Sequence, residues 1–166
     1  MRLFIASPVR LENYTQIREE FNDTVQGKWV EEENLHLTWI FLGDVSDEHA
    51  VIKKMKELAL PKTEVTIAEL GYFGRPPRIL FAKAQKKSLY ETATHFKESG
   101  FDLYRFKPHI TLCRIKQINN YKRYKEIMKC YREKTLGTVL PQITLYKSEL
   151  SEKGPEYTAL YTLGEL

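Results

Sequence analysis

The stretches HLTWIFLG (residues 36–43) and HITLCRIK (residues 109–116) begin with one shared pattern of histidine, an apolar residue, threonine and an apolar residue. Both are rich in branched and aromatic side chains, which are typical of β-strands. Residues two positions apart in a strand point to the same face. The histidine and threonine of each stretch therefore share a face, and the apolar residue between them points into a core. The same alternation predicts that Phe41 also lies in the core, on the face opposite His36.

Apolar alternation and helical spacing predict the other elements of the chain. The expected strands cover residues 2–9, 34–43, 63–74, 78–85 and 107–116 and a final pair within 140–166, and the expected helices cover 10–22, 44–61, 86–100 and 119–134. Strands that follow one another without a crossover helix favour antiparallel pairing, so the pattern predicts the α+β class. Each histidine strand precedes a helix and then a pair of strands, which indicates a duplicated architecture.

Length and charge narrow the class of protein. The 166 residues suffice for one domain or two small associated lobes, and we expect a single domain over residues 1–166. The net charge of +4 fits an anionic partner such as nucleic acid, and it fits an ordinary solvated surface equally well. No signal peptide or apolar run of membrane-spanning length is recognised, so we expect a soluble, cytoplasmic protein.

The cysteines and the remaining histidines do not suggest a metal site. Cys113 falls in an apolar run, as expected of a buried thiol, and it forms no CxxC pair with Cys130. His49 and His95 fall in expected helices and are interpreted as surface or packing residues. A zinc site on the two strand histidines would need further ligands, and no HExxH motif or nearby acidic cluster supplies them. We therefore expect neither a metal nor a cofactor.

Two histidines facing one cleft suit the hydrolysis of a phosphodiester. In-line displacement needs a base that activates water and an acid that protonates the leaving oxygen on the opposite side of the phosphorus. Histidine can fill either role near neutral pH, and each positioned acid or base accelerates a reaction by about 10²- to 10⁴-fold. The threonine hydroxyls can donate to the non-bridging phosphate oxygens. A single histidine of this kind is more often structural, but the repetition of the pattern favours the catalytic interpretation.

The motifs HLTW and HITL resemble the paired HxTx signatures of the two-histidine phosphoesterases. Within that superfamily the chain is most similar to the RNA 2′,3′-cyclic phosphodiesterases, also described as LigT-like 2′-5′ RNA ligases. The resemblance covers nearly the whole chain and includes KWVEEENLHLTWIFLGDV (28–45), GYFGRPPRILFAKA (71–84) and FKPHITLCRIK (106–116). It implies two pseudo-twofold-related lobes, each an antiparallel sheet with outer helices, that enclose a central groove in which the motifs face each other.

The resemblance also implies roles for the motif residues. His36 would be the proton donor and His109 the proton acceptor, while Thr38 and Thr111 would bind the phosphate of the substrate. The implied reaction is metal-independent hydrolysis of an RNA 2′,3′-cyclic phosphate end to a 2′-phosphomonoester. The residues by themselves predict the pair of histidines but not which of them is the acid.

Other basic and aromatic residues are secondary candidates for substrate binding. Arg114, just beyond the second motif, could contact a phosphate or could be a surface charge at a strand edge. Arg75 could lie on a loop at the mouth of the groove, with the same alternative. The tyrosines of the basic helix expected over residues 119–134 are interpreted mainly as packing residues and secondarily as stacking partners of RNA bases.

Two other functions are compatible with the same fold. One is an ATP-independent 2′-5′ RNA ligase acting on tRNA halves, which would use the same site with a 5′-hydroxyl in place of water. The other is a non-catalytic RNA-binding module. The intact histidines and threonines of both motifs argue against the module, because binding alone would tolerate their loss. We expect an RNA partner, no membrane partner and a monomer.

Overall fold

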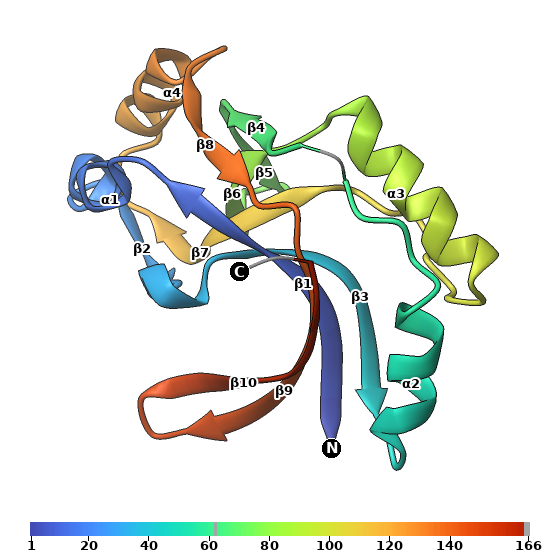
Figure 1. Cartoon of the computed structure of the whole chain (residues 1–166). Helices are drawn as coiled ribbons and strands as arrows, with labels where there is room; N and C mark the ends of the chain where they lie inside the picture. The colour runs from blue at the N-terminus through green and yellow to red at the C-terminus, as the bar shows by residue number, and fades with distance from the viewer. Residues whose placement is uncertain (62, 165–166) are drawn as a thin grey trace.

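The computed structural model describes residues 1–61 and 63–164, which fold around a curled antiparallel sheet with helices on its outer side (Figure 1). The strands are β1 (Arg2–Leu11), β2 (Val25–Trp29), β3 (His36–Asp44), β4 (Val65–Ala68), β5 (Leu70–Phe73), β6 (Ile79–Lys83), β7 (His109–Ile118), β8 (Thr135–Val139), β9 (Ile143–Ser151) and β10 (Gly154–Leu163). The helices are α1 (Tyr14–Phe21), α2 (Glu48–Met55), α3 (Lys87–Glu98) and α4 (Tyr121–Cys130), and Glu32–Asn34 form a 3-10 turn. These elements confirm the expected α+β class.

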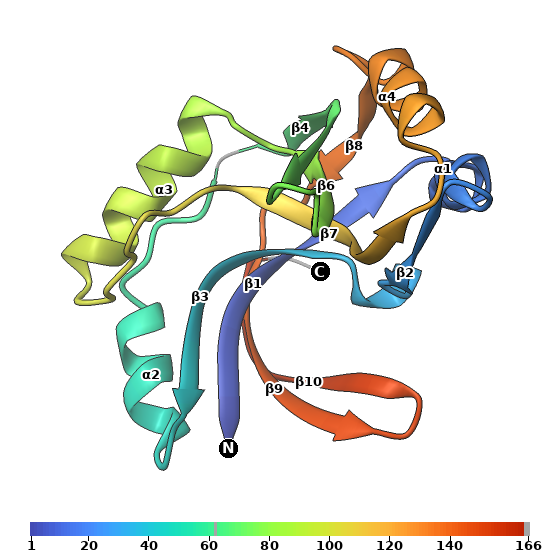
Figure 2. The same ribbon diagram turned by 180° about the vertical axis from the view of Figure 1, so that it is seen from behind.

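The two histidine strands lie side by side where the two halves of the sheet meet. The strand order is β10-β9-β1-β3-β7-β6-β5, with β2 paired to β7 and the β4–β8 pair joined through β1. One half of the sheet ends in β3 and the other begins with β7. Figure 2 shows α2 and α3 along one side of the sheet and α1 and α4 together at another end. The arrangement confirms the expected pair of lobes with outer helices.

Several strands differ from the sequence-based expectation because they change partners along their length. β1 does not end at Pro8 but continues to Leu11, pairing with β9 up to Ala6 and with β8 from Val9 onward. Proline lacks an N–H group and is tolerated where a strand changes partners. The expected strand 63–74 is split in the same way at Glu69, whose φ of 71° ends β4 before β5 pairs with β6.

The face of the sheet that packs against the helices carries the hydrophobic core. Leu37 and Ile110 are fully buried there, and Trp39 stacks on Phe96 of α3 with ring centroids 5.2 Å apart. Cys113 is also buried with a free thiol, as expected, and burial raises its pKa to about 12. The core therefore fixes the outer face of both histidine strands.

Each histidine strand contains a β-bulge three residues after its histidine. On β3, Trp39 is the extra residue between the pairs Ala6–Thr38 and Ile5–Ile40. On β7, Leu112 is the extra residue between Phe81–Thr111 and Leu80–Cys113. A bulge interrupts the alternation of side chains, so later residues change face.

The bulges correct the expectation for Phe41. Phe41 pairs with Phe4, which shares its face with Ala6, the partner of Thr38. Phe41 therefore lies on the face of His36, and its side chain is 74% exposed instead of buried in the core. The prediction that Phe41 lies in the core was wrong because it assumed strict alternation along a strand without a bulge.

Buried polar groups anchor both bulges. The indole Nε1 of Trp39 donates to the hydroxyl of Ser7 at 2.7 Å, and that hydroxyl donates to the carbonyl oxygen of Gln142. The carbonyl oxygen of Leu112 accepts from the backbone N–H of Val30 at 2.8 Å, and the Tyr14 hydroxyl lies 3.2 Å from it. Since buried polar groups are costly to leave unpaired, these contacts hold the bulges in place.

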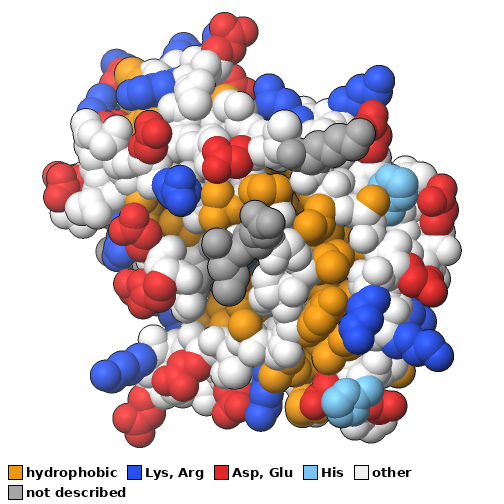
Figure 3. Space-filling view, viewed as in Figure 1, with side chains coloured by type: hydrophobic (Ala, Val, Ile, Leu, Met, Phe, Trp, Pro, Cys, Tyr) orange, Lys and Arg blue, Asp and Glu red, His pale blue; other side chains and the backbone are white. Residues whose placement is uncertain are grey.

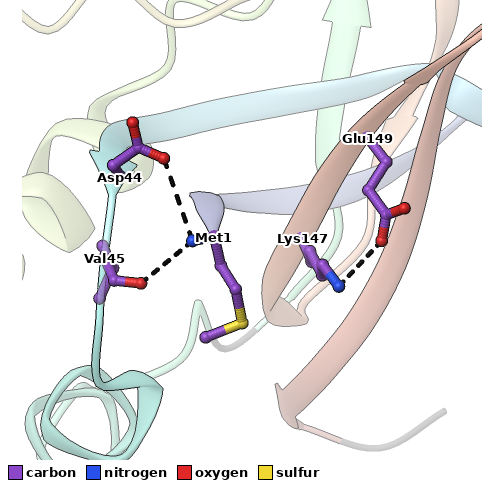
Figure 4. A network of polar contacts seen from close by, with 5 residues as sticks. All are labelled: Met1, Asp44, Val45, Lys147 and Glu149. Atoms are coloured by element: carbon purple, nitrogen blue, oxygen red, sulfur yellow. Dashed lines mark hydrogen bonds and ion pairs between the residues drawn. The ribbon is translucent and has the colours of Figure 1, made fainter.

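Charged side chains contribute less to the fold than these buried contacts. At the far end of β1, the amino group of Met1 donates to the carbonyl of Val45 at 3.3 Å and lies 3.9 Å from Asp44, while Lys147 pairs with Glu149 at 2.9 Å (Figure 4). Exposed pairs of this kind are typically worth about 0–1 kcal/mol. Figure 3 shows acidic and basic side chains interspersed around apolar ones on this face, so the net charge does not by itself locate a partner.

The Trp39 bulge gives a stability prediction. Ser7→Ala deletes the acceptor of a buried indole N–H, so we expect the free energy of unfolding to fall by about 1–3 kcal/mol in urea denaturation. Ser88→Ala, an exposed position on α3, is the matched control and should change it by less than about 0.5 kcal/mol. Equal stability of the two variants would show that Ser7 does not anchor the bulge.

Candidate active site

The register of β3 against β7 brings the four motif residues to one face of the sheet. Leu37 pairs directly with Ile110, and both are buried on the side of the helices. The residues that flank this pair point the opposite way. We call this the open face and define it by these flanking residues, which are His36, Thr38, His109 and Thr111. Both expected pairs therefore lie on one surface, on neighbouring strands.

Both histidines are held by the same contact. Nδ1 of His36 lies 2.6 Å from the carbonyl oxygen of Asn34, and Nδ1 of His109 lies 2.6 Å from the carbonyl oxygen of Lys107. A carbonyl oxygen only accepts hydrogen bonds, so Nδ1 carries a hydrogen in both rings. Nε2 is then the nitrogen left for chemistry, as an acceptor in a neutral ring and a donor in a protonated one. In this arrangement Nε2 of each ring could give or take a proton.

Aromatic rings fix the orientation of both imidazoles. The His36 ring contacts Phe4 and Tyr157, with centroid distances of 5.2 Å and 5.6 Å. The His109 ring contacts Phe73 and Phe81 at 5.0 Å and 5.3 Å. These aromatic side chains come from β1, β10, β5 and β6, far apart in the sequence, so the sequence analysis missed them. Only the assembled sheet shows that they flank the histidines.

Burial lowers the pKa of both histidines. Desolvation of the charged ring is the main cause in each case, and the hydrogen bond to a backbone carbonyl partly opposes it. The pKa of His36 is lowered further by the charge of His109, which shows that the two rings interact electrostatically. Both rings are therefore mainly neutral at pH 7 without a ligand, and a bound anion would favour their protonated forms.

The Leu112 bulge places Arg114 on the open face. Arg114 pairs with Ile79 of β6, which shares its face with Phe81, the partner of Thr111. Its charge lowers the pKa of Tyr157, although burial raises that pKa overall, so Arg114 lies toward the ring beside His36. Of the two secondary candidates, this is the one that the fold brings to the histidines.

Arg75 is not brought into contact with the motif residues. It is exposed on the turn between β5 and β6, two residues after Phe73. In the described part of the chain, no side chain forms an ion pair with it. Lys28 pairs with Arg114 and therefore shares its face, and sequence reasoning missed this cation because its place depends on the unexpected strand β2.

The described residues also bear on metal binding and membrane spanning. Within residues 1–61 and 63–164 there is no cluster of three or more His, Cys, Asp or Glu side chains that could hold a metal ion. His95 lies on α3 with its Nδ1 3.6 Å from Glu98, and His49 lies at the start of α2. No helix in this part of the chain is long and apolar enough to cross a membrane.

Comparisons with known proteins identify the family of this chain. The sequence model described as LigT like Phosphoesterase matches residues 5–81. The chain is 33% identical to the RNA 2′,3′-cyclic phosphodiesterase of Methanocaldococcus jannaschii, over 96% of this chain and 98% of that protein. It is 32% identical to the Aquifex aeolicus protein of the same name, over 87% and 85% of the two chains.

Solved structures give the same result. A Thermus thermophilus protein superposes with a TM-score of 0.69 at 26% identity, covering 98% of this chain and 96% of that one. Escherichia coli LigT in its apo form superposes with a TM-score of 0.69 at 25% identity, covering 98% and 95%. The shared fold and the full-length identity to named relatives show that this chain belongs to the LigT-like phosphoesterases, a family of phosphodiesterase enzymes.

Proposed function

We propose that this chain hydrolyses 2′,3′-cyclic phosphate ends of RNA to 2′-phosphomonoesters without a metal ion. The observation that carries the proposal is the pair of histidines on the open face, each with Nδ1 engaged by a carbonyl and Nε2 left for chemistry. The substrate class is that of the relatives, which are named RNA 2′,3′-cyclic phosphodiesterases. Since both histidines come from one chain, a single bilobal domain acting as a monomer suffices.

The proposed reaction is one in-line displacement at phosphorus. Nε2 of His109 takes a proton from water as the water oxygen bonds to phosphorus. The bond from phosphorus to the 3′ oxygen breaks, and Nε2 of His36 gives that oxygen its proton. The products are a 2′-phosphate and a 3′-hydroxyl, and proton exchange with solvent resets both rings. The division of roles between the histidines follows the family resemblance, since the two rings are held alike.

The remaining open-face residues complete the proposed phosphate site. The hydroxyls of Thr38 and Thr111 donate to the non-bridging oxygens, where charge accumulates in the transition state. Arg114 supplies a guanidinium that can pair with the same phosphate. Arg75 stays a weaker candidate for contact with a distant part of the substrate. The 2′-5′ ligase reaction would use the same site with a 5′-hydroxyl in place of water as the nucleophile, and the 3′ oxygen would again be the leaving group.

Metal independence is tested directly. Turnover of a short RNA with a 2′,3′-cyclic end should persist in excess chelator, because two histidines and two threonines supply the acid, the base and the phosphate donors. The product isomer, assigned by phosphorus NMR, should be the 2′-phosphomonoester. Loss of activity in chelator that zinc or manganese restores would refute the metal-free mechanism.

Leaving-group chemistry separates the two histidines. His36→Ala and His109→Ala should each remove most of the rate, about 10²- to 10⁴-fold in kcat. A substrate whose leaving group needs no protonation should partly rescue the variant that lacks the acid, predicted to be His36, and not the other. Rescue of the His109 variant alone would reverse the assignment. Small, additive losses would mean that neither ring is catalytic.

The pH profile follows from the lowered pKa values. In the free enzyme both pKa values lie below the ordinary 6.5, so kcat/KM should form a bell whose two limbs fall below about pH 6.5. The substrate phosphate should hold His36 protonated to higher pH, so the alkaline limb of kcat should lie above that of kcat/KM. Initial rates measured from about pH 4 to about pH 9, roughly two units on either side of the ordinary histidine pKa, give the pH profiles of kcat and kcat/KM. An alkaline limb of kcat that lies at or below that of kcat/KM would contradict the assignment.

A further inference from the structure

A pocket lies outside the open face, between α4 and the edge strand β5. It has a volume of about 270 Å³. Leu70 and Tyr72 of β5 line one wall, and Tyr121 and Lys125 belong to the α4 wall. Neither HxT motif contributes to it. Its chemistry therefore calls for a separate explanation.

The pocket is lined by an excess of positive charge. Lys125, Lys129 and Arg132 line it without an ion-pair partner in the described part of the chain. The carboxylate among the lining residues, Glu69, is already paired with Lys83 at 2.6 Å. The lining therefore carries four cations and one carboxylate, and this excess of positive charge around one cavity favours an anionic ligand.

The pocket also presents aromatic faces. Tyr72 and Tyr121 are 47% and 44% exposed, and both rings contact Tyr124, at centroid distances of 6.3 Å and 5.9 Å. The hydroxyl of Tyr124 is buried and has no hydrogen-bond partner among the described residues. Buried polar groups are normally paired, so an oxygen or nitrogen of a ligand would satisfy this hydroxyl. Of the tyrosines on the basic helix, Tyr121 is exposed and has the Lys125 ammonium 5.0 Å from its ring centroid, while Tyr124 and Tyr131 are buried.

Lys83 connects this pocket to the open face. Its backbone pairs with His109, and its side chain crosses Gly71, where a Cβ atom would lie 2.8 Å from the Lys83 Cε. Beyond Gly71 its ammonium group reaches Glu69 at the pocket. Only β6 and β5 separate β7 from the pocket, which is about 10 Å at the usual spacing of strands.

We propose that this pocket binds a nucleotide of the RNA chain on the 5′ side of the cyclic end, with the base stacked on Tyr72 or Tyr121 and a phosphate on Lys125, Lys129 or Arg132. The inference rests on the proposed function, because its ligand is the RNA whose end occupies the open face. Exposed tyrosine rings beside unpaired cations favour single-stranded RNA over an acidic peptide, since every base offers a face for stacking.

The test compares a nucleoside 2′,3′-cyclic monophosphate with a hexanucleotide that carries the same end. The monophosphate cannot reach the pocket, so Lys125→Ala/Lys129→Ala should leave its kcat/KM unchanged and lower that of the hexanucleotide about tenfold. The slope of log(kcat/KM) against log salt for the hexanucleotide should become shallower by about 0.7, the change expected for the loss of one phosphate contact on a single strand. Tyr121→Ala should also lower kcat/KM for the hexanucleotide alone, by about fivefold or more.

The control is Lys53→Ala/Lys122→Ala, which removes the same charge from exposed positions that do not line the pocket. It should lower hexanucleotide turnover by less than about twofold. If the control and pocket variants lose hexanucleotide turnover equally, the loss comes from the lower net charge, and RNA binding at the pocket is refuted. Equal losses on both substrates, or no loss on either, would overturn it as well.

Binding measurements separate this inference from the proposed function. Fluorescence anisotropy of a labelled hexanucleotide reports the pocket even if the wild-type enzyme cleaves neither substrate. Weaker binding by the pocket variants without turnover would refute the function and retain an RNA site. Normal turnover of both substrates with unchanged binding by the pocket variants would refute only the pocket. Competition by inorganic phosphate alone, without any effect of Tyr121→Ala, would mean an anion site and would overturn the stacking of a base.

Discussion

The pairing of Leu37 with Ile110 at the centre of the sheet determines where every motif residue points. Both side chains are fully buried, and each contributes about 1.5–3 kcal/mol of burial free energy. A slip of one residue would turn the histidine and threonine of one strand toward the helices and expose its apolar residues. The hydrophobic core therefore maintains the alignment of the polar residues, although neither Leu37 nor Ile110 lies on the open face.

The two bulges extend this constraint along both strands. Without them, the fifth residue after each histidine would point into the core. With them, Phe41 and Arg114 join the open face, and the residues at the bulges are themselves secured by Ser7, Val30 and Tyr14. Bulges are common next to active sites because they redirect a side chain without changing the strand partners. Here a bulge occurs three residues after the histidine in both halves of the sheet, as expected from duplication.

The sequence was informative where local chemistry determines the structure. The repeated motif and its alternation predicted both histidines, both threonines and their shared face, and the spacing of apolar residues predicted all four helices. The bulges could not be predicted, because an extra residue is specified by the partner strand and by buried contacts such as that from Trp39 to Ser7, 32 residues away. The short strand β2 was missed for a related reason. Its Gln26, Gly27 and Lys28 are polar or small and exposed, and β7 alone supplies its hydrogen-bonding partner.

Duplication gives the two halves one geometry, but the side chains around the histidines make the halves chemically different. His36 lies beside Phe4 and Tyr157, and His109 lies beside Phe73 and Phe81. The equivalent fifth residues are an apolar ring in one half and a guanidinium in the other. An asymmetric substrate, with a base on one side of its phosphorus and a leaving oxygen on the other, requires such a difference. Two identical half-sites would bind it in either direction, whereas under the proposed function the difference between Phe41 and Arg114 would favour one direction. In the proposed reaction the symmetric backbone would supply the paired imidazoles, and the divergence of a few side chains would supply the polarity that an acid and a base need.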